Sequence, residues 1–392
     1  MKRIGMLLVV MMFTAGMVFA QNNTADIDQS GNNNSADVDQ FGYSNFAEIV
    51  QSGDDDTAEI DQSGSENQAR IEQSQGGSGA RSAEGYINQQ GDGNVASQEQ
   101  RIWSAHNTIL AIIDQVGFDN TATQNQNTGT SVRAEISQQG YDNVASQTQE
   151  FTYGFSSALI DQVGDGNQAT QLQNSRDSEA VILQEGLDNV AAQTQSGRYN
   201  DAEIAQYGAE NQASITQDGE NNTAVIEQGA WGGSENSVAN FTQTGDGNYF
   251  ETTMVRSYDN TVTGVQEGDD NYFRAGVRGY DNVVTMDVFG DANRGSWSIG
   301  SIGWPHQPAD NELTINVIGS DNYSSGVIAG DENVVNILQH GNGNRIGTSW
   351  HTADGVNIEG DRNTVSIQQY SDYNSASVTV VGHGNTASIV QD

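Results

Sequence analysis

Carboxylate side chains are the groups that most readily suggest a chemical role for this chain. The sequence holds 52 Asp and Glu residues against 14 Lys and Arg, with five His and no Cys. Many of the acids follow glycine, in the segments GDDD, GDGN, GDDN, GDAN and GDEN. Clustered carboxylates of this kind could bind Ca²⁺, and carboxylates on one face of a solenoid could be the acid and base of a polysaccharide-cleaving enzyme.

The distribution of these residues argues against both uses. Calcium-binding nonapeptide repeats carry paired glycines, which are missing here. The acids are spread along the chain and are not gathered beside unlike partners, as a reaction centre requires. The His are scattered too, at His106, His306, His340, His351 and His383. We therefore expect solvated acidic turns, turn positions for the His, no enzyme activity, and no dedicated metal site or cofactor.

The positions of the acidic residues follow a short sequence repeat. Gln recurs every 11 residues at Gln29, Gln40, Gln51, Gln62 and Gln73, and Gly follows four of them after two places. Numbered from its Gln, the unit reads QxGxxNxAxIxQ, and its last Gln opens the next unit. A fixed period indicates one structural unit used many times.

The unit predicts a turn followed by a β-strand of about seven residues. Asn, Ala, Ile or Val, and the closing Gln share parity, so they point to one face of an extended strand. Gly can adopt positive φ and Asn can bond to its own backbone, which suits a turn at GxxN. An 11-residue period could also give a helical supercoil, but Gly, Asn, Ile and Val in each unit disfavour a helix.

Two kinds of unit alternate in the middle of the chain. The position two before the closing Gln is Gln in one set, at Gln98, Gln124, Gln147, Gln171 and Gln193. It is Ile in the units between them, at Ile87, Ile113, Ile136, Ile160, Ile182 and Ile204. This alternation predicts a rung of two strands and about 22 residues, stacked so that like residues form ladders. The insertions after Gln73, Gln100, Gln126 and Gln149 would then leave the coil on one side.

The expected fold is therefore all-β, a single parallel β-solenoid. About 31 spacings separate Gln29 from Gln391, which gives 15 or 16 rungs at about two units per rung. We expect open ends without a capping segment, and such edges favour the head-to-tail addition of subunits. Frayed ends, or ends covered by a partner, are the alternative.

Composition bounds the location and the partners. Residues 1–20 read as a secretory signal peptide, because a charged start precedes an apolar run. Without Lys2 and Arg3 the chain keeps 12 basic residues against 52 acidic ones, a formal charge of −40, which disfavours nucleic acid and anionic membranes. We expect a secreted protein, with Gln- and Asn-rich repeats over residues 21–243 and Val- and Ile-rich repeats of the same solenoid over residues 244–392.

The residues expected to carry self-assembly are buried amides and turn glycines. The amide ladder comprises Gln29, Asn34, Gln40, Asn45, Gln51, Gln62, Gln89, Asn94, Gln100, Gln115, Asn120, Gln138, Asn143, Gln162, Asn167, Gln184, Asn189, Gln206, Asn211 and Gln217. The turn glycines are Gly31, Gly42, Gly53, Gly64, Gly91, Gly117, Gly140, Gly164, Gly186, Gly208 and Gly219. Ladders of this kind stabilise cross-β stacks.

Stacking also sets charges over one another on the outer faces. The expected acidic pairs are Asp37 over Glu59 and Asp39 over Asp61. Glu48 would lie over Arg70 and attract it. Like charges at about 5 Å repel by somewhat under about 1 kcal/mol even in water, so we expect acidic ladders to restrain premature assembly until low pH or salt relaxes them.

Aromatic and Thr residues offer two further roles for the surface. The aromatic candidates are Trp103, Trp231, Trp297, Trp304 and Trp350, with Tyr141, Tyr258 and Tyr280 of the turns. They could contact glycans or dyes, although covering exposed rungs is the simpler interpretation. An ice-binding solenoid needs regular outward Thr rows, whereas Thr57 and Thr121 stand isolated in the sequence.

The units resemble curlin repeats, the building blocks of curli, which are amyloid fimbriae of bacterial biofilms. The motif QxGxxNxA with a closing Gln is matched from Gln29 to Gln40, from Gln40 to Gln51, from Gln89 to Gln100 and from Gln206 to Gln217. The resemblance implies secretion through an outer-membrane pore, nucleated self-assembly outside the cell, possible pairing with a nucleator subunit, and roles in adhesion and biofilm matrix.

The chain departs from that family in three ways. It has many more repeats than a typical curlin, it lacks a distinct targeting segment before the repeats, and Val or Ile replaces the closing Gln in its last third. These departures leave open whether the chain is a bulk subunit, a nucleator or a surface-bound relative. A monomeric surface adhesin, or a solenoid that binds cations or glycans, is the alternative function.

Overall fold

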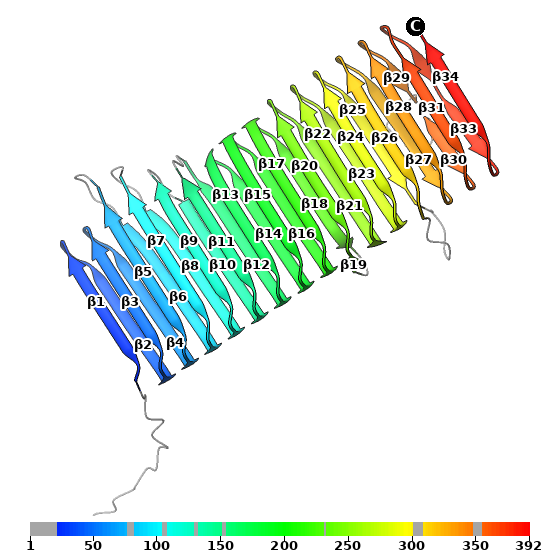
Figure 1. The fold of residues 1–392 in the computed structure, drawn as a ribbon. Coiled ribbons are helices and arrows are strands. Elements are labelled where there is room, and N and C mark those ends of the chain that lie inside the picture. Colours follow the sequence, from blue (N-terminus) through cyan, green and yellow to red (C-terminus); the bar gives the residue numbers. More distant parts are fainter. Residues whose placement is uncertain are drawn as a thin grey trace, which may run out of the picture.

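The structure, a computed structural model, describes residues 22–76, 82–103, 108–128, 132–150, 154–230, 233–300, 309–347 and 355–392. The expected signal peptide lies outside this part of the chain. The described residues form strands, turns and bends without a helix. Successive strands alternate between two parallel sheets, which stack into a straight rod (Figure 1).

Sheet B is the sheet to which the first strand belongs, and it holds 16 strands. They are β1 (Thr24–Ser30), β3 (Phe46–Ser52), β5 (Gln68–Gln75), β7 (Val95–Ile102), β9 (Thr121–Thr128), β11 (Val144–Glu150), β13 (Gln168–Arg176), β15 (Val190–Arg198), β17 (Gln212–Glu220), β20 (Val238–Thr244), β22 (Thr261–Glu267), β24 (Val283–Phe289), β26 (Glu312–Ile318), β28 (Val334–His340), β31 (Thr364–Gln369) and β34 (Thr386–Gln391).

Sheet A faces sheet B and holds 18 segments, three of which continue a segment of the same rung, so that it has 15 strand positions. They are β2 (Ser35–Tyr43), β4 (Thr57–Ser65), β6 (Ser82–Asp92), β8 (Thr108–Phe118), β10 (Val132–Tyr141), β12 (Ser156–Asp165), β14 (Glu179–Leu187), β16 (Asp201–Ala209), β18 (Thr223–Ala230) with β19 (Ser234–Glu235), β21 (Tyr249–Tyr258), β23 (Tyr272–Tyr280), β25 (Arg294–Ile299), β27 (Tyr323–Ala329), β29 (Arg345–Ile346) with β30 (Val356–Glu359), and β32 (Ser375–Ala376) with β33 (Val378–Val381). The predicted solenoid of 15 to 16 two-strand rungs is confirmed.

The register follows the repeat. Ile136 pairs with Ile113 below it and Ile160 above it in sheet A, and Gln147 pairs with Gln124 and Gln171 in sheet B. The two kinds of unit therefore occupy different sheets, as predicted. The strands that flank the four early insertions all lead from sheet B to sheet A, so the four insertions fall in the same kind of connection, while the inserted residues themselves lie outside the described residues.

The turn glycines are required for two physical reasons. Gly42 has φ of 109° and is followed by Ser44 at 58°, immediately before the buried Asn45. A Cβ on Gly42 would also lie 1.8 Å from the carbonyl oxygen of Gly64 in the next rung. All the predicted turn glycines have positive φ except Gly53. There the side chain of Gln75 lies over the glycine and replaces the usual contact between rungs.

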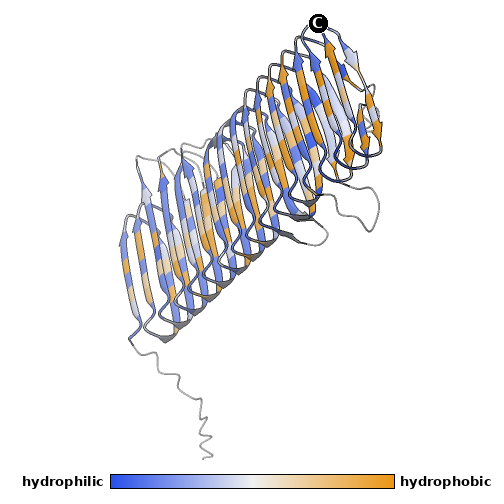
Figure 2. Ribbon diagram, turned by 45° about the vertical axis from the view of Figure 1, so that its right-hand side comes forward, coloured by the Kyte–Doolittle hydropathy of each residue, from blue (hydrophilic) through white to orange (hydrophobic). Residues whose placement is uncertain are grey.

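The main hydrophobic cluster extends along the rod from Ala47 to Val380, and a second, small cluster comprises Ala83, Ile102, Ile109 and Val132. Apolar bands cross the strands in line along the rod (Figure 2). In the last third, where the sequence has Val- and Ile-rich repeats, Val288, Val317 and Ile328 are buried at positions that hold Gln elsewhere. This alternation of buried and exposed residues is what a pleated strand with one covered face requires.

Large aromatic side chains fill this last third opposite strand glycines. A Cβ on Gly264, Gly295 or Gly326 would each lie 2.2 Å from an aromatic ring of the core. The ring at Gly326 belongs to Trp297, which is 2% exposed. The expectation that Trp297 contacts ligands or covers a rung at the surface is therefore wrong. Because the glycine of the neighbouring strand has no Cβ, it leaves a space that the large inward-pointing aromatic side chain fills.

Candidate self-assembly interface

Buried Gln side chains form hydrogen-bonded rows along both sheets. In sheet B the Nε2 of each Gln donates to the Oε1 of the Gln one rung further on, at 2.6 to 3.1 Å, in the row Gln29, Gln51, Gln73, Gln100, Gln126, Gln149, Gln173, Gln195, Gln217, Gln243 and Gln266. In sheet A the row is Gln40, Gln62, Gln89, Gln115, Gln138, Gln162, Gln184, Gln206 and Gln228. The predicted ladder positions are therefore brought together.

The same amides tie the two sheets to each other. The Nε2 of Gln51 donates to Gln73 at 2.9 Å and also to the carbonyl oxygen of Ser35, at the start of a sheet A strand, at 3.0 Å. Gln62 makes the equivalent pair of bonds to Gln89 and Phe46. Both amide hydrogens are thus used, so a buried polar group that would otherwise be costly becomes a cross-link between the sheets.

The Gln rows have a direction, because each donates towards the C-terminal end of the rod. A third row, formed by Gln98, Gln124, Gln147, Gln171 and Gln193, ends against an Ile on either side. Its first member has a buried Oε1 without a hydrogen-bond partner. The same holds for Gln339, which begins the row resumed by Gln369 and Gln391. These two rows thus begin with a buried acceptor that has no hydrogen-bond partner.

The Asn rows point the opposite way. The backbone N–H and the Nδ2 of Asn67 both donate to the Oδ1 of Asn45, one rung before it, at 3.1 and 3.2 Å. Its Nδ2 also donates to the carbonyl oxygen of Gly91, in the next rung, at 2.7 Å. The sequence predicts both a bond from Asn to its own turn, which Asn45 makes to Phe41, and a ladder of Asn side chains between rungs. The bonds between rungs, which a turn motif does not reveal, are the more regular ones.

Acidic turn residues also join rungs. The Oδ1 of Asp92 accepts the backbone N–H of Ser65 at 2.8 Å, and that of Asp165 accepts the N–H of Tyr141 at 3.1 Å. The Asp after the turn glycine therefore accepts a hydrogen bond from a backbone N–H of the preceding rung. This bond explains the recurrence of Gly-Asp in the turns better than solvation of the carboxylate does. In the described part of the chain, no cluster of His, Asp and Glu could hold a metal ion.

The outward acidic columns lie where the sequence predicts them. Asp37 pairs with Glu59 and Asp39 pairs with Asp61 across one rung of sheet A. Burial raises the pKa of Asp61, and the neighbouring charges of Asp39 and Asp37 raise it further. On sheet B the Arg70 guanidinium meets Glu48 at 2.8 Å, as expected.

Asp56 is a carboxylate inside an amide row. It occupies the ladder position held by Asn34 one rung earlier, and it is fully buried. Its Oδ1 accepts bonds from Ala83 at 3.0 Å and Gln75 at 2.7 Å, whereas its Oδ2 has no partner. Burial raises the pKa of Asp56 against the lowering effect of these two bonds. The sequence signal was an Asp in the Asn position of the repeat.

The aromatic candidates separate into three groups. The turn tyrosines lie at the surface in stacked pairs, with ring centroids 5.1 Å apart for Phe118 and Tyr141 and 5.0 Å apart for Tyr258 and Tyr280. Trp103 is 38% exposed. The remaining Trp and three of the His lie outside the described residues, namely Trp231, Trp304, Trp350, His106, His306 and His351.

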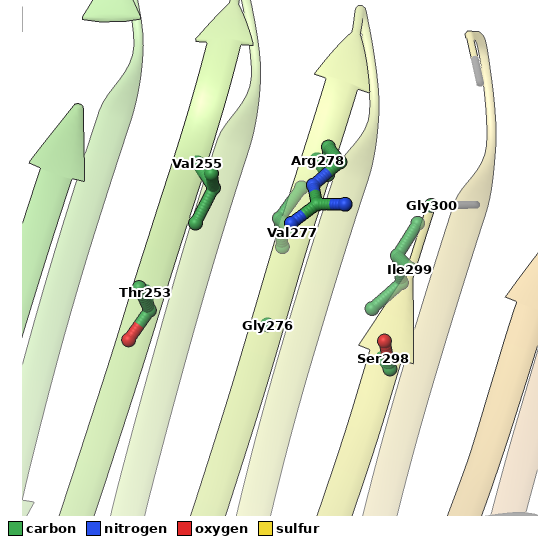
Figure 3. Close-up of a pocket in the computed structure, with 8 residues that line it drawn as sticks. All are labelled: Thr253, Val255, Gly276, Val277, Arg278, Ser298, Ile299 and Gly300. Carbon is green, nitrogen blue, oxygen red and sulfur yellow. The ribbon is translucent and has the colours of Figure 1, made fainter. Parts of the chain in front are cut away.

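A shallow hollow of about 420 Å³ lies on the outer face of sheet A, across β21, β23 and β25 (Figure 3). Thr253, Gly276 and Ser298 form its floor, and Arg278 is the one ionisable group of its lining. The hollow exists because Gly276 and Gly300 leave the middle of the face without side chains. Its lining holds neither a carboxylate nor a His, and it supplies no acid–base pair.

The rod ends in two similar strands of sheet B. β1 is exposed along its length and pairs with β3, while β34 pairs with β31. β1 begins TADIDQ and β34 reads TASIVQ, so that the inward Ala, Ile and Gln occur in the same order. At the C-terminal edge the Nε2 of Gln391 bonds the carbonyl oxygen of Ser375.

These features define the protein as a two-sheet parallel β-solenoid whose rungs are joined by amide ladders. Residues 20–53, 53–81, 175–208 and 360–392 match the family model of the curlin associated repeat, so the chain carries curlin repeats in these segments. A comparison with curated protein sequences returned no match. No helix in the described residues is long and apolar enough to cross a membrane.

Proposed function

We propose that this curlin-repeat protein is a secreted structural subunit whose copies add head to tail to form curli-like amyloid fimbriae on the cell surface. The match between the terminal strands of sheet B carries the proposal. If β1 of one copy pairs with β34 of another, Ala25 lies on Ala387, Ile27 on Ile389 and Gln29 on Gln391, so each inward ladder continues.

The direction of the ladders supports this order of addition. Gln rows donate towards the C-terminal end, so Gln391 offers an Nε2 where the next copy offers the acceptor Oε1 of Gln29. Asn rows donate in the other direction, so Asn385 offers an Oδ1 to the backbone N–H and amide of Asn23. Head-to-head contacts would set like groups against each other.

The number of strands in each sheet leaves two possible junctions between copies. Because sheet B has one strand more than sheet A, pairing β1 with β34 leaves one strand position of sheet A unfilled. The alternative is for β1 to take the place of β34 on β31, where residues 364–369 read TVSIQQ, and for β2 to lie on β32 and β33. A variant that ends at Val381 forces this second junction, and fibre growth from it would show that elongation does not need β34.

The first test is a time course of amyloid-dye fluorescence on the mature protein, with and without preformed seeds. We expect a lag that seeds abolish, and a meridional reflection at about 4.7 to 4.8 Å from the product. A protein that stays monomeric and β-rich under these conditions would overturn the proposal.

The roles in adhesion and biofilm matrix, an outer-membrane secretion pore and a nucleator subunit are proposals that rest on the family. A monomeric surface adhesin is the second candidate, and the exposed aromatic stack of Phe118 on Tyr141 favours it. Aromatic faces of this kind can bind sugar rings. Tyr141→Ala should then abolish glycan binding by the monomer without changing its circular dichroism.

A further inference from the structure

The outer face of sheet B lacks charge over much of the rod. In seven consecutive strands, β9, β11, β13, β15, β17, β20 and β22, the first three outward positions hold no acid, Lys, Arg or His. They are Thr121, Thr123, Asn125, Val144, Ser146, Thr148, Gln168, Thr170, Leu172, Val190, Ala192, Thr194, Gln212, Ser214, Thr216, Val238, Asn240, Thr242, Thr261, Thr263 and Val265. We call these 21 residues the neutral face.

The outer face of sheet A differs over the same length of rod. The corresponding positions of β10, β12, β14, β16, β18 and β21 include eight charged residues, which are Arg133, Glu135, Asp161, Glu179, Asp201, Glu203, Glu227 and Glu251. The repeat itself does not forbid charge at outward positions. The two faces of one solenoid are therefore chemically distinct.

The neutral face also holds a row of Thr residues. Thr194, Thr216 and Thr242 lie beside one another on three successive strands of sheet B. Thr57 and Thr121 have no Thr beside them on the neighbouring strands, as expected. The row of Thr194, Thr216 and Thr242 was missed because neighbours in space are a full rung apart in the sequence. Leu172 and Val190 add apolar area to this face, with 37% and 40% of their surface exposed.

We infer that the neutral face is an interface between two copies of this chain, which pair side by side with their sheets B facing each other. Interface centres are depleted in charged residues, because burying an unpaired charge is costly. A chain with a formal charge of −38 repels its own copies over most of its surface. The neutral face is the part of the described surface where two rods approach without burying carboxylates.

The size of the neutral face suits a stable pair. Seven strands about 4.8 Å apart, each with three outward residues about 6.8 Å apart, cover about 700 Å² per copy. Two copies would bury about 1,400 Å², within the range of about 1,200 to 2,000 Å² that specific protein interfaces bury.

The spacing of the face selects a second copy as the partner. Its side chains form straight ladders with the period of one rung, and a partner with the same period meets each row in register along the whole length. Thr, Val and Ser are small or β-branched, so two such faces can interdigitate at the separation of about 10 Å found between stacked sheets.

The test places positive charges on the neutral face. Thr148→Lys, Thr194→Lys and Thr242→Lys lie on alternate strands, and their neighbours across the strands are uncharged. The matched control is Ser137→Lys, Ser157→Lys and Thr223→Lys, which adds the same charge to sheet A. Both are first checked by circular dichroism for a folded β-rich state.

Sedimentation of the folded protein before any fibre forms gives the first readout. We expect a concentration-dependent dimer for the unsubstituted protein and the control, and a rise of at least about 100-fold in the dimer dissociation constant for the neutral-face variant. A monomer at all concentrations, or equal dimerisation of the two variants, would overturn the inference.

The second readout does not depend on solution equilibria. The chain has no Cys, so a single Thr194→Cys residue is unique, and we expect it to form a disulfide-linked dimer faster than Ser137→Cys does. If fibres form, their mass per length should equal two rods and fall to one in the Lys variant. A monomer that slows ice recrystallisation through the same face would instead assign the Thr rows to ice. Because these measurements work on the rod itself, they stand even if head-to-tail growth fails.

Discussion

At the scale of single residues, glycine and the ladder amides are fixed by stacking as much as by local backbone geometry. The turn glycines are needed because a Cβ would strike the carbonyl of the next rung, a contact that no turn rule predicts. The buried Asn and Gln are tolerated because each finds partners in the rungs above and below. A residue in this protein is therefore best understood together with its copies one rung away.

Gly117→Ala tests the two roles of a turn glycine. Gly117 has φ of 128°, and a Cβ would lie 2.0 Å from the carbonyl oxygen of Gly140. We expect the free energy of unfolding in urea to fall by about 3 kcal/mol or more, since strain and overlap add. Gly276→Ala is the control, because its nearest neighbour would be 4.0 Å away. A loss no larger for Gly117→Ala than for the control would contradict this account.

Asp56→Asn tests the carboxylate in the amide row. Burial raises the folded-state pKa of Asp56 above its ordinary value of 3.8, so ionisation destabilises the fold at neutral pH. Below the unfolded pKa the group is protonated in both states, and this penalty vanishes. We therefore expect Asp56→Asn to stabilise the protein at pH 7 and to have little effect below about pH 3.8.

The control for that measurement is Asp142→Asn, at an exposed turn position far along the rod with φ of 55° that Asn also tolerates. This substitution should leave unchanged the difference between the free energies of unfolding at the two pH values. A stabilisation by Asp56→Asn that is equal at both pH values would rule out ionisation as the cause.

At the scale of elements, a row is the unit of stability. Gln147 sits in the middle of the third Gln row, where it accepts from Gln124 at 3.0 Å and donates to Gln171 at 2.9 Å. Ile71 and Ile215 continue the same row at its two ends. One position can thus hold either an amide ladder or an apolar ladder, provided that neighbours match.

Gln147→Ala should therefore cost more than its size suggests. It leaves a donor on Gln124 and an acceptor on Gln171 without their partners, and we expect a loss of about 2 to 4 kcal/mol in urea unfolding. Replacing all five Gln of the row by Ile removes the side-chain donors and acceptors of the row together, although the sheet A carbonyls to which they donate remain. The total loss should therefore be smaller than that of the single variant multiplied by five. Additive losses would show that the Gln act independently.

At the scale of the whole molecule, charge and periodicity act together. The acidic columns repel within a rod, but β34 carries no acid at its outward positions, so the expected restraint on assembly is not local to the junction. It must come from the summed charge of the rod, which salt screens over about 10 Å at 0.1 M. Protonation adds to this effect, since the pKa values of Asp61, Asp114 and Asp201 are raised, mainly by burial.

We accordingly expect seeded elongation to accelerate when salt is added and when the pH falls from 7 towards about 5. Carboxylates with raised pKa values take up protons first on that path, and the repulsion between rods falls with them. A series with sucrose in place of salt controls for osmolarity. Growth rates that respond to neither salt nor pH would contradict an electrostatic restraint.

The sequence by itself determined the strand period, the inward face, the assignment of Gln98 and Ile87 to different sheets, and the number of rungs. These features follow from parity and from an 11-residue spacing, both of which are local and repeated. Only the tertiary structure decided which residues meet a rung away. Examples are Gly326 against Trp297, Gln75 over Gly53, which lacks the positive φ of the other turn glycines, and the row of Thr194, Thr216 and Thr242. Insertions make the rungs unequal in length, so these partners are separated by different numbers of residues, and stacking alone brings them into register.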